Sequence, residues 1–194
     1  MTRRVDPVEA LRVVRAVRRE NDVVITTMGS ARDWMADGMS ALDLIFVPSA
    51  MGHATSIGLG LALAQPDRRI IVCNGDGSML MNLGSLATIA ASGATNLAVI
   101  VFDNGIYEVT GAQPTPNAIA NVDFAAIARG CGIASVYRFE TTDSWQKAAA
   151  AIVAGVGPHV IVLPTAQVTG KPGPKSPGKA ADRAAAFMKA LAPT

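Results

Sequence analysis

The sequence predicts an α/β domain with a doubly wound, mostly parallel β-sheet and helices on both faces. Five runs of apolar, often β-branched residues lack polar alternation, as strands buried on both faces do. These runs cover residues 23–29, 68–77, 96–105, 133–139 and 158–165. Stretches of small residues at helical spacing separate the runs, and strands that alternate with helices form parallel sheets.

The composition favours a single soluble domain. The chain has 194 residues, of which 50% are hydrophobic, and a net charge of +2 from 17 basic and 15 acidic side chains. That balance gives no reason to expect a nucleic-acid-binding surface. No signal peptide or membrane span is evident, so we expect a cytoplasmic protein without a membrane partner. Cys73 and Cys131 are too far apart for a metal-binding clip, and no disulfide framework is expected.

The first helix should begin at Asp6 and Pro7, a typical N-cap followed by a first-turn proline. Its arginines are expected to face solvent: Arg12, Arg15, Arg18 and Arg19. Further helices are predicted at about 52–64, 79–92, 123–130 and 143–154. The glycines and alanines of 52–64 would let that helix lie very close to the sheet, a neighbouring helix or a ligand.

The chain is expected to divide into three parts. Residues 1–168 form the domain, 169–179 an exposed linker, and 180–194 a C-terminal helix. The linker contains three glycines, three prolines and three lysines, a composition that disfavours regular structure. The helix should dock on the domain or on a partner through Phe187, Met188 and Leu191.

Polar side chains follow the second and third predicted strands, where ligands of such sheets bind. Asp76 and Asn104 are one strand–helix–strand unit apart, and a right-handed crossover can place them at neighbouring strand tips. A carboxylate, an amide oxygen and a main-chain carbonyl, here most plausibly that of Ile106, suit a hard divalent cation. Gly75 and Gly77 allow close approach of a diphosphate, and the following helix start with Ser78 can bind its oxygens. The sequence therefore predicts a metal–diphosphate clamp.

These residues resemble a known motif. "GDGS" (75–78), followed one strand–helix–strand unit later by "DN" (103–104), is similar to the thiamin diphosphate motif, Gly-Asp-Gly and then Asn-Asn. Asp103 replaces the first asparagine, whereas Asn104 keeps the second, which resembles the metal ligand. The segments 49–64, 75–90 and 103–116 resemble the diphosphate-binding half of the sulfopyruvate and phosphonopyruvate decarboxylases. The likeness runs from about Val23 to the C-terminal helix, and the length resembles the β subunit of sulfopyruvate decarboxylase.

The resemblance implies a set of roles. Asp76, Asn104 and the Ile106 carbonyl would bind Mg²⁺, and Gly77 and Ser78 the diphosphate. Further cofactor contacts are implied for Gly29, Ser30, Ser49 and Met51. The main-chain carbonyl of Ser49 would accept from the aminopyrimidine, and Met51 would hold the cofactor in a bent shape that brings its amino nitrogen to the reactive carbon. Substrate contacts are expected for His53, Thr110 and Gln113.

The resemblance also implies an activity and a partner. The family's acid–base glutamate comes from the pyrimidine-binding half, and none of Glu9, Glu20, Glu108 and Glu140 fits that position. An α subunit should therefore complete a hetero-oligomer that converts an anionic 2-oxo acid, of the sulfopyruvate or phosphonopyruvate type, to an aldehyde and CO₂. The alternatives are a carboligase of the acetolactate synthase type and a non-catalytic nucleotide- or phosphate-binding module. A ferredoxin-linked oxidoreductase lacks its cluster cysteines, and a flavodoxin-like protein its aromatic pair.

Overall fold

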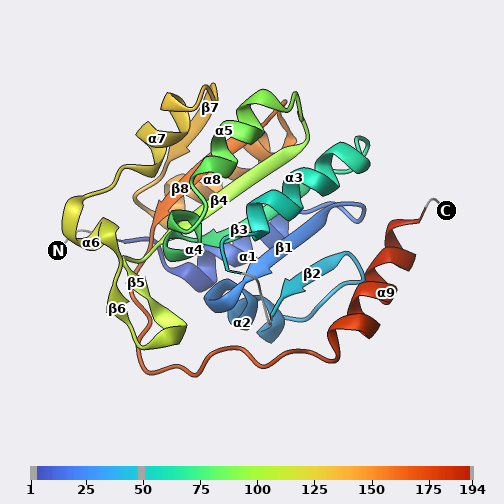
Figure 1. Ribbon diagram of the computed structural model, residues 1–194, viewed down its shortest axis with the longest axis horizontal. Coiled ribbons are helices and arrows are strands. Elements are labelled where there is room, and N and C mark those ends of the chain that lie inside the picture. Colours follow the sequence, from blue (N-terminus) through green and yellow to red (C-terminus); the bar gives the residue numbers. More distant parts are fainter. Residues whose placement is uncertain (1–3, 48–50, 193–194) are drawn as a thin grey trace.

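The computed structural model describes residues 4–47 and 51–192 and has a six-stranded, fully parallel sheet (Figure 1). The strand order is β2-β1-β3-β4-β8-β7. The strands are β1 (Val23–Thr27), β2 (Asp43–Phe46), β3 (Ile70–Gly75), β4 (Leu97–Asp103), β7 (Ser135–Arg138) and β8 (His159–Pro164). The predicted α/β architecture is confirmed.

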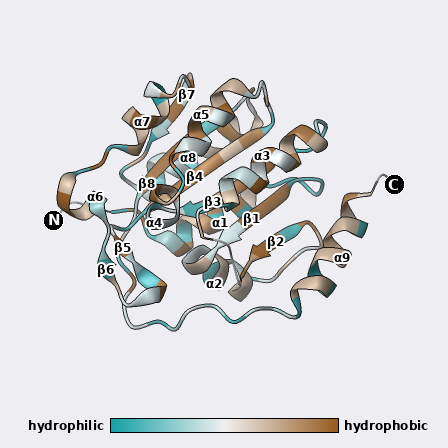
Figure 2. Ribbon diagram, viewed as in Figure 1, coloured by the Kyte–Doolittle hydropathy of each residue, from teal (hydrophilic) through white to brown (hydrophobic). Residues whose placement is uncertain are grey.

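Helices cover both faces of this sheet, because successive strand side chains point to opposite sides. One face packs against α1 (Pro7–Val17), α2 (Met28–Ala36) and α8 (Thr142–Ala154). The other packs against α3 (Ala54–Ala64), α4 (Asp76–Leu80), α5 (Gly84–Ala91), α7 (Phe124–Gly130) and α9 (Ala180–Leu191). Figure 2 shows the apolar central strands between these helices. None of the described helices is long and apolar enough to cross a bilayer.

A small excursion follows β4 at the carboxyl edge of the sheet. It consists of β5 (Ile106–Tyr107), the 3₁₀ turn η1 (Glu108–Thr110), β6 (Gln113–Pro114) and α6 (Pro116–Ala120). β5 and β6 pair antiparallel, with Ile106 opposite Pro114. This excursion carries several of the predicted site residues.

Outside the excursion, the structure adds a strand and a helix that were not predicted. β2 is an edge strand of only four residues, and its apolar run is Leu44, Ile45 and Phe46 after Asp43, shorter than the runs of the central strands. The stretch 23–29 ends as a strand at Thr27, and α2 begins directly at Met28. The predicted helix 79–92 is two helices, α4 and α5, separated by 81–83. In that break, the Asn82 amide nitrogen donates to the Gly52 carbonyl, which ties the break to the turn before α3.

The close approach of α3 to the sheet is confirmed. A Cβ on Gly58 would collide with Cγ2 of Val72 in β3. Only glycine allows the helix to lie at this distance.

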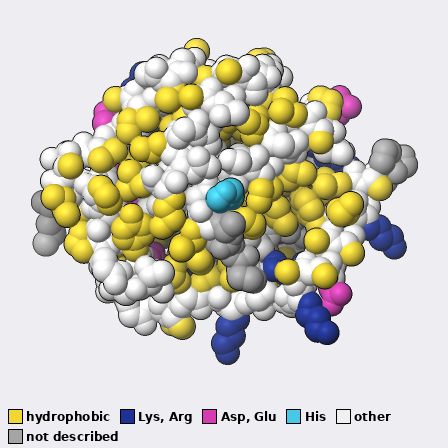
Figure 3. Space-filling view, in the orientation of Figure 1, with side chains coloured by type: hydrophobic (Ala, Val, Ile, Leu, Met, Phe, Trp, Pro, Cys, Tyr) yellow, Lys and Arg dark blue, Asp and Glu magenta, His cyan; other side chains and the backbone are white. Residues whose placement is uncertain are grey.

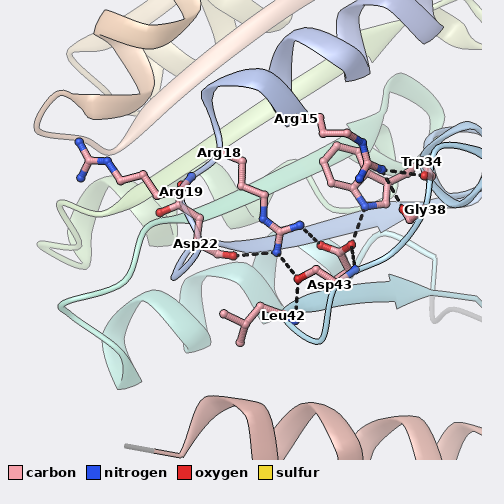
Figure 4. A network of polar contacts seen from close by, with 9 residues as sticks. Arg15, Arg18, Arg19, Asp22, Trp34, Gly38, Leu42 and Asp43 are labelled. Atoms are coloured by element: carbon pink, nitrogen blue, oxygen red, sulfur yellow. Dashed lines mark hydrogen bonds and ion pairs between the residues drawn. The ribbon is translucent and has the colours of Figure 1, made fainter. Parts of the chain in front are cut away.

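The solvent-facing prediction for α1 is right for Arg12 and Arg19 and wrong for Arg15 and Arg18. Arg15 lies 4.0 Å above the Trp34 ring, and Arg18 pairs with the fully buried carboxylate of Asp43 (Figure 4). Arginine readily combines stacking and ion pairing in partly buried positions. The predicted N-cap is confirmed, because Asp6 accepts from the main-chain nitrogens of residues 8 and 9.

The linker is exposed as predicted and runs past the β5–β6 excursion to α9 beyond the edge strand β2 (Figure 1). Phe187 is buried there, whereas Met188 is 70% exposed and does not dock on the domain, so docking of Met188 on a partner stays a prediction. Arg183 donates to the carbonyls of Ile45 and Val47. These contacts join α9 to the end of the edge strand.

His159 should make stability depend on pH. Its side chain is buried, neither ring nitrogen has a hydrogen-bond partner among the described residues, and burial lowers its pKa. In the unfolded chain the histidine has its ordinary pKa of about 6.5, so below this pH the unfolded chain binds a proton more readily than the folded chain does. We therefore expect the folded state to keep its full stability above about pH 6.5 and to lose stability as the pH falls below that value.

Chemical denaturation of wild type and His159→Leu between pH 8 and 5 measures this effect. The variant should lose less stability on acidification than wild type. His53→Gln, a change at an exposed histidine, should retain the wild-type dependence. Parallel pH profiles for wild type and His159→Leu would contradict the assignment.

Candidate active site: a cavity at the carboxyl edge of the sheet

A cavity of about 340 Å³ opens at the carboxyl ends of the central strands. Its lining combines residues that follow β1, β3 and β4, as the switch-point rule for such sheets leads one to expect. Ten of the predicted site residues line it, among them Gly29, Ser30, Met51, Gly75, Asp76, Gly77, Ser78 and Asn104. Ile106 and Thr110 also belong to the lining.

Asp76 is a buried carboxylate at the junction of β3 and α4. Its Oδ2 accepts from the main-chain nitrogen of Gly105 at 3.1 Å and from the Thr115 hydroxyl at 2.9 Å. These bonds connect the end of β3 to the excursion after β4. Neither of these two bonds uses Oδ1, and a carboxylate oxygen has more than one lone pair with which to accept another ligand.

The electrostatics of Asp76 fit a missing cation. The side chain is 2% exposed and makes no ion pair with any described residue. Burial, opposed by the hydrogen bond from Thr115, raises its pKa to about 6. Buried carboxylates are ordinarily paired or bound to metal. A divalent cation beside Oδ1 would supply the partner that the protein itself does not.

Asn104 and Ile106 line the same cavity as Asp76 and offer two further oxygens. The register of β3 and β4 pairs Gly75 with Phe102, so Asp76 and Asn104 follow neighbouring strand ends, as predicted. Asn104 Oδ1 accepts from the Ile106 nitrogen at 2.9 Å. Pro114 lies opposite Ile106 and has no N–H to donate to the Ile106 carbonyl. A carboxylate, an amide oxygen and a carbonyl form an all-oxygen donor set that suits Mg²⁺.

No group of three or more His, Cys, Asp or Glu side chains that could hold a metal occurs in the described part of the chain. The donor set above does not need one. It contains a single carboxylate, and Mg²⁺ commonly takes its remaining ligands from substrate phosphates and water.

The residues predicted to contact a diphosphate lie at the start of α4. Open space surrounds the position of a Gly75 Cβ, whereas a Gly77 Cβ would lie 2.6 Å from the Tyr107 ring. The Tyr107 side chain of the excursion therefore accounts for glycine at position 77. The Ser78 hydroxyl accepts from the Gly52 nitrogen at 3.3 Å, so its proton remains available for an anionic oxygen.

The two predicted cofactor contacts after β1, Ser30 and Gly29, line the cavity and already have neighbours within the protein. Ser30 Oγ accepts from the Thr27 nitrogen and lies 2.9 Å from the Cys73 carbonyl oxygen. Gly29 faces the Glu108 carboxylate. Met28 adopts a φ of 43°, a strained conformation for a bulky side chain, at the same point of the lining.

The other predicted residues are distributed unevenly. Met51 lines the cavity and is 46% exposed, and Thr110 lines it from η1. His53 and Gln113 are exposed and outside the lining, and the Gln113 amide donates to the Thr110 carbonyl. Ser49 lies outside the described residues.

The sequence analysis missed an ion-pair chain beside the cavity. Glu108 lines the cavity and accepts from Arg32, which also pairs with Asp33. Arg32 and Glu108 are 76 residues apart, and neither belongs to the clamp motif. No motif or spacing in the sequence indicates that these two side chains form an ion pair.

Figure 3 shows apolar side chains spread over the face formed by α3, α4 and α5. Its exposed members include Met51, Leu63 and Met81, which are 46%, 55% and 48% exposed. Met51 and Met81 also line the cavity, so this apolar surface continues into the mouth of the site.

A family model described as "thiamine pyrophosphate enzyme, C-terminal TPP binding domain" matches residues 22–163. The chain belongs to the thiamine pyrophosphate enzymes. The matched span contains the ends of β1, β3 and β4 that form the cavity.

Among the relatives of this thiamine pyrophosphate enzyme are phosphonopyruvate decarboxylases. That of Streptomyces viridochromogenes is 37% identical over 185 residues, 91% of this chain and 44% of the relative. That of Streptomyces hygroscopicus is 43% identical over 119 residues, 61% and 29% of the two chains. The chain thus spans less than half the length of these relatives.

A further relative is of similar length. The sulfopyruvate decarboxylase subunit beta of Methanothermobacter thermautotrophicus is 38% identical over 145 residues, 75% of this chain and 76% of the relative. Among solved structures, the thiamine diphosphate-dependent 4-hydroxybenzoylformate decarboxylase of Rhodococcus jostii RHA1 has the same fold, with a TM-score of 0.71 and 20% sequence identity. The match covers 87% of this chain and 34% of that chain.

Proposed function

We propose that the chain is the diphosphate-binding, β-type subunit of a thiamin diphosphate-dependent decarboxylase that uses Mg²⁺. Its substrate is a 2-oxo acid with a second anionic group, sulfonate or phosphonate, and its products are an aldehyde and CO₂. The observation that carries the proposal is that Asp76 and Asn104 line one cavity and that the buried Asp76 makes no ion pair with any described residue. The names of the relatives at 37–43% identity support the reaction class.

The clamp residues act by binding and orienting. Asp76 Oδ1, Asn104 Oδ1 and the Ile106 carbonyl would hold Mg²⁺. The first main-chain nitrogens of α4 and the Ser78 hydroxyl would donate to the diphosphate oxygens. Bound thiamin diphosphate would supply an electron sink for the loss of CO₂. Met51, at the cavity mouth, would support the organic part of the cofactor.

A partner chain completes the site. The Glu108 carboxylate is held by Arg32 and Asn104, and Glu9, Glu20 and Glu140 lie outside the cavity lining. An α subunit therefore supplies the acid–base glutamate. The apolar face at Met51, Leu63 and Met81 suits such a partner, because exposed apolar patches mark interaction surfaces.

Decarboxylation is favoured over carboligation because the chain is more similar in sequence to the decarboxylases than to an acetolactate synthase. The putative acetolactate synthase large subunit IlvX of Mycobacterium tuberculosis is 28% identical over 174 residues, below the decarboxylases. A non-catalytic phosphate-binding module would need the glycine turns, but it would not need Asn104 or Met51 in the same cavity.

Reconstitution with the partner subunit tests the proposal. The purified chain alone should release no CO₂ from sulfopyruvate or phosphonopyruvate, and adding the partner should give CO₂ and an aldehyde in equal amounts. Pyruvate, which lacks the second anionic group, serves as the control substrate. Turnover by the single chain would contradict the need for a partner, and acetolactate formation from pyruvate would favour the carboligase.

A further inference from the structure

We propose that Glu108 is a positioning residue, held by Arg32, that orients the Asn104 amide so that its oxygen faces Mg²⁺. This inference rests on the proposed function, because it assigns a task to side chains around the proposed metal site. Three contacts carry it: Glu108 with Asn104, Glu108 with Arg32, and Arg32 with Asp33.

The contact with Asn104 selects one end of the amide. Glu108 Oε2 accepts from Asn104 Nδ2 at 3.0 Å, while Oδ1 of the same amide accepts from the Ile106 nitrogen at 2.9 Å. An ionised carboxylate only accepts and a main-chain nitrogen only donates. A rotated amide would place its oxygen against the carboxylate and its NH₂ group against an N–H group. Both neighbours therefore favour one orientation, in which Oδ1 keeps a second lone pair for a cation.

Arg32 fixes Glu108 in turn. Its Nη1 donates to Glu108 Oε1 at 2.7 Å, which leaves Oε2 for Asn104. Its other nitrogens donate to both carboxylate oxygens of Asp33, at 2.8 and 3.0 Å. The three side chains are only 16%, 12% and 9% exposed, for Arg32, Glu108 and Asp33. Low exposure and the two-pronged pair with Asp33 make this a rigid support rather than a solvent-screened surface contact.

The surroundings of Glu108 leave room for this arrangement. A Cβ on Gly29 would lie 3.2 Å from Glu108 Oε2, so the absence of a side chain lets the carboxylate reach the start of α2. The N-terminus of a helix favours negative charge. Together with Arg32, it offsets the charge of Glu108. The carboxylate can then act as an acceptor for Asn104 instead of competing with Asp76 for the metal ion.

The test measures Mg²⁺ binding to the full chain by calorimetry, in saturating thiamin diphosphate. Loss of a side chain that orients a metal ligand typically weakens metal affinity by about 10- to 100-fold. Glu108→Ala should raise the Mg²⁺ Kd by about tenfold. Glu108→Gln, whose carbonyl oxygen can still accept from Asn104, should retain more affinity. Glu20→Ala removes an equal charge from an exposed position and should leave the Kd unchanged.

Repeating the Glu108→Ala substitution in an Asn104→Asp variant shows whether Glu108 orients the Asn104 amide or only stabilises the surrounding structure. Asn104→Asp presents two equivalent oxygens, so there is no amide to orient, and its charge lies beside that of Glu108. In this background, Glu108→Ala should leave the Mg²⁺ Kd unchanged or lower it. Weakening by the same factor in both backgrounds would overturn the inference. An unchanged Kd for Glu108→Ala in an otherwise wild-type chain would also overturn it.

The failures of the two proposals are distinguishable. A wild-type chain that binds neither Mg²⁺ nor thiamin diphosphate overturns the proposed cofactor site, and this inference with it. A wild-type chain that binds both, alongside a Glu108→Ala variant of equal affinity, overturns the inference alone. Thermal unfolding of each variant without ligands checks that it is folded.

Discussion

Asp76→Ala should abolish Mg²⁺-dependent binding of thiamin diphosphate. Asp76 is the one carboxylate in the proposed donor set, and its Oδ2 also holds Gly105 and Thr115, which position the excursion that carries Asn104. Removing a buried charged partner costs about 2–5 kcal/mol of binding free energy, which corresponds to a loss of about 30-fold or more in affinity. Calorimetric titration with thiamin diphosphate, with and without Mg²⁺, measures the change.

Two controls make this result specific. Asp67→Ala removes an exposed aspartate and should bind the cofactor as wild type does. Asp76→Asn keeps an acceptor for Gly105 and Thr115 but loses the charge, so it should retain the fold and still bind Mg²⁺ weakly. Wild-type affinity in Asp76→Ala would remove the clamp assignment and leave only the fold.

Asp43→Ala should be strongly destabilising without touching the cavity. Asp43 pairs with Arg18 and accepts from the Trp34 indole nitrogen at 2.9 Å (Figure 4). The Arg18 side chain is 9% exposed, so the substitution leaves a mostly buried charge without its carboxylate. Breaking a buried pair in this way costs about 3–5 kcal/mol of unfolding free energy. Urea unfolding measures the loss.

The matched control is Glu9→Ala. Glu9 pairs with Arg12, and both side chains are 52% exposed. Exposed pairs of this kind contribute about 1 kcal/mol or less. The double variant Arg18→Met with Asp43→Leu removes both charges and should recover much of the stability lost in Asp43→Ala. Equal losses for Asp43→Ala and Glu9→Ala would contradict a special role for the buried pair.

The central strands and the clamp could be predicted because their signals are local. Unbroken apolar runs mark strands buried on both faces, and the polar residues directly after them must lie at the carboxyl edge of a parallel sheet. Asp76 and Asn104 follow adjacent strands β3 and β4, so their convergence needed no information beyond strand order. The glycines of α3, Gly58 among them, indicated a close approach of this helix to a neighbour for a similar reason. A glycine inside a helix lowers the stability of the fold and is therefore expected where close contact leaves no room for a side chain.

One expectation was wrong because the environment of the residue comes from a distant segment. Arg18 has the spacing of a solvent-facing residue, but its carboxylate partner lies on an edge strand too short to be recognised. Gln113 is exposed and lies outside the cavity lining, and its contact with substrate stays a prediction. In α9, Phe187 and Arg183 contact the domain, whereas docking of the exposed Met188 on a partner stays a prediction.

The layered architecture and the strand ends that carry Asp76 and Asn104 follow from patterns within one strand–helix–strand unit, so both could be predicted from the amino-acid sequence. The contacts around these two side chains depend on the packing of segments that are distant in the chain. Asp33, Arg32, Glu108 and Asn104 form a continuous chain of contacts across 76 residues of sequence. Side-chain partners at such separations depend on how α2 and the excursion after β4 pack together, and no periodicity along the chain encodes that packing.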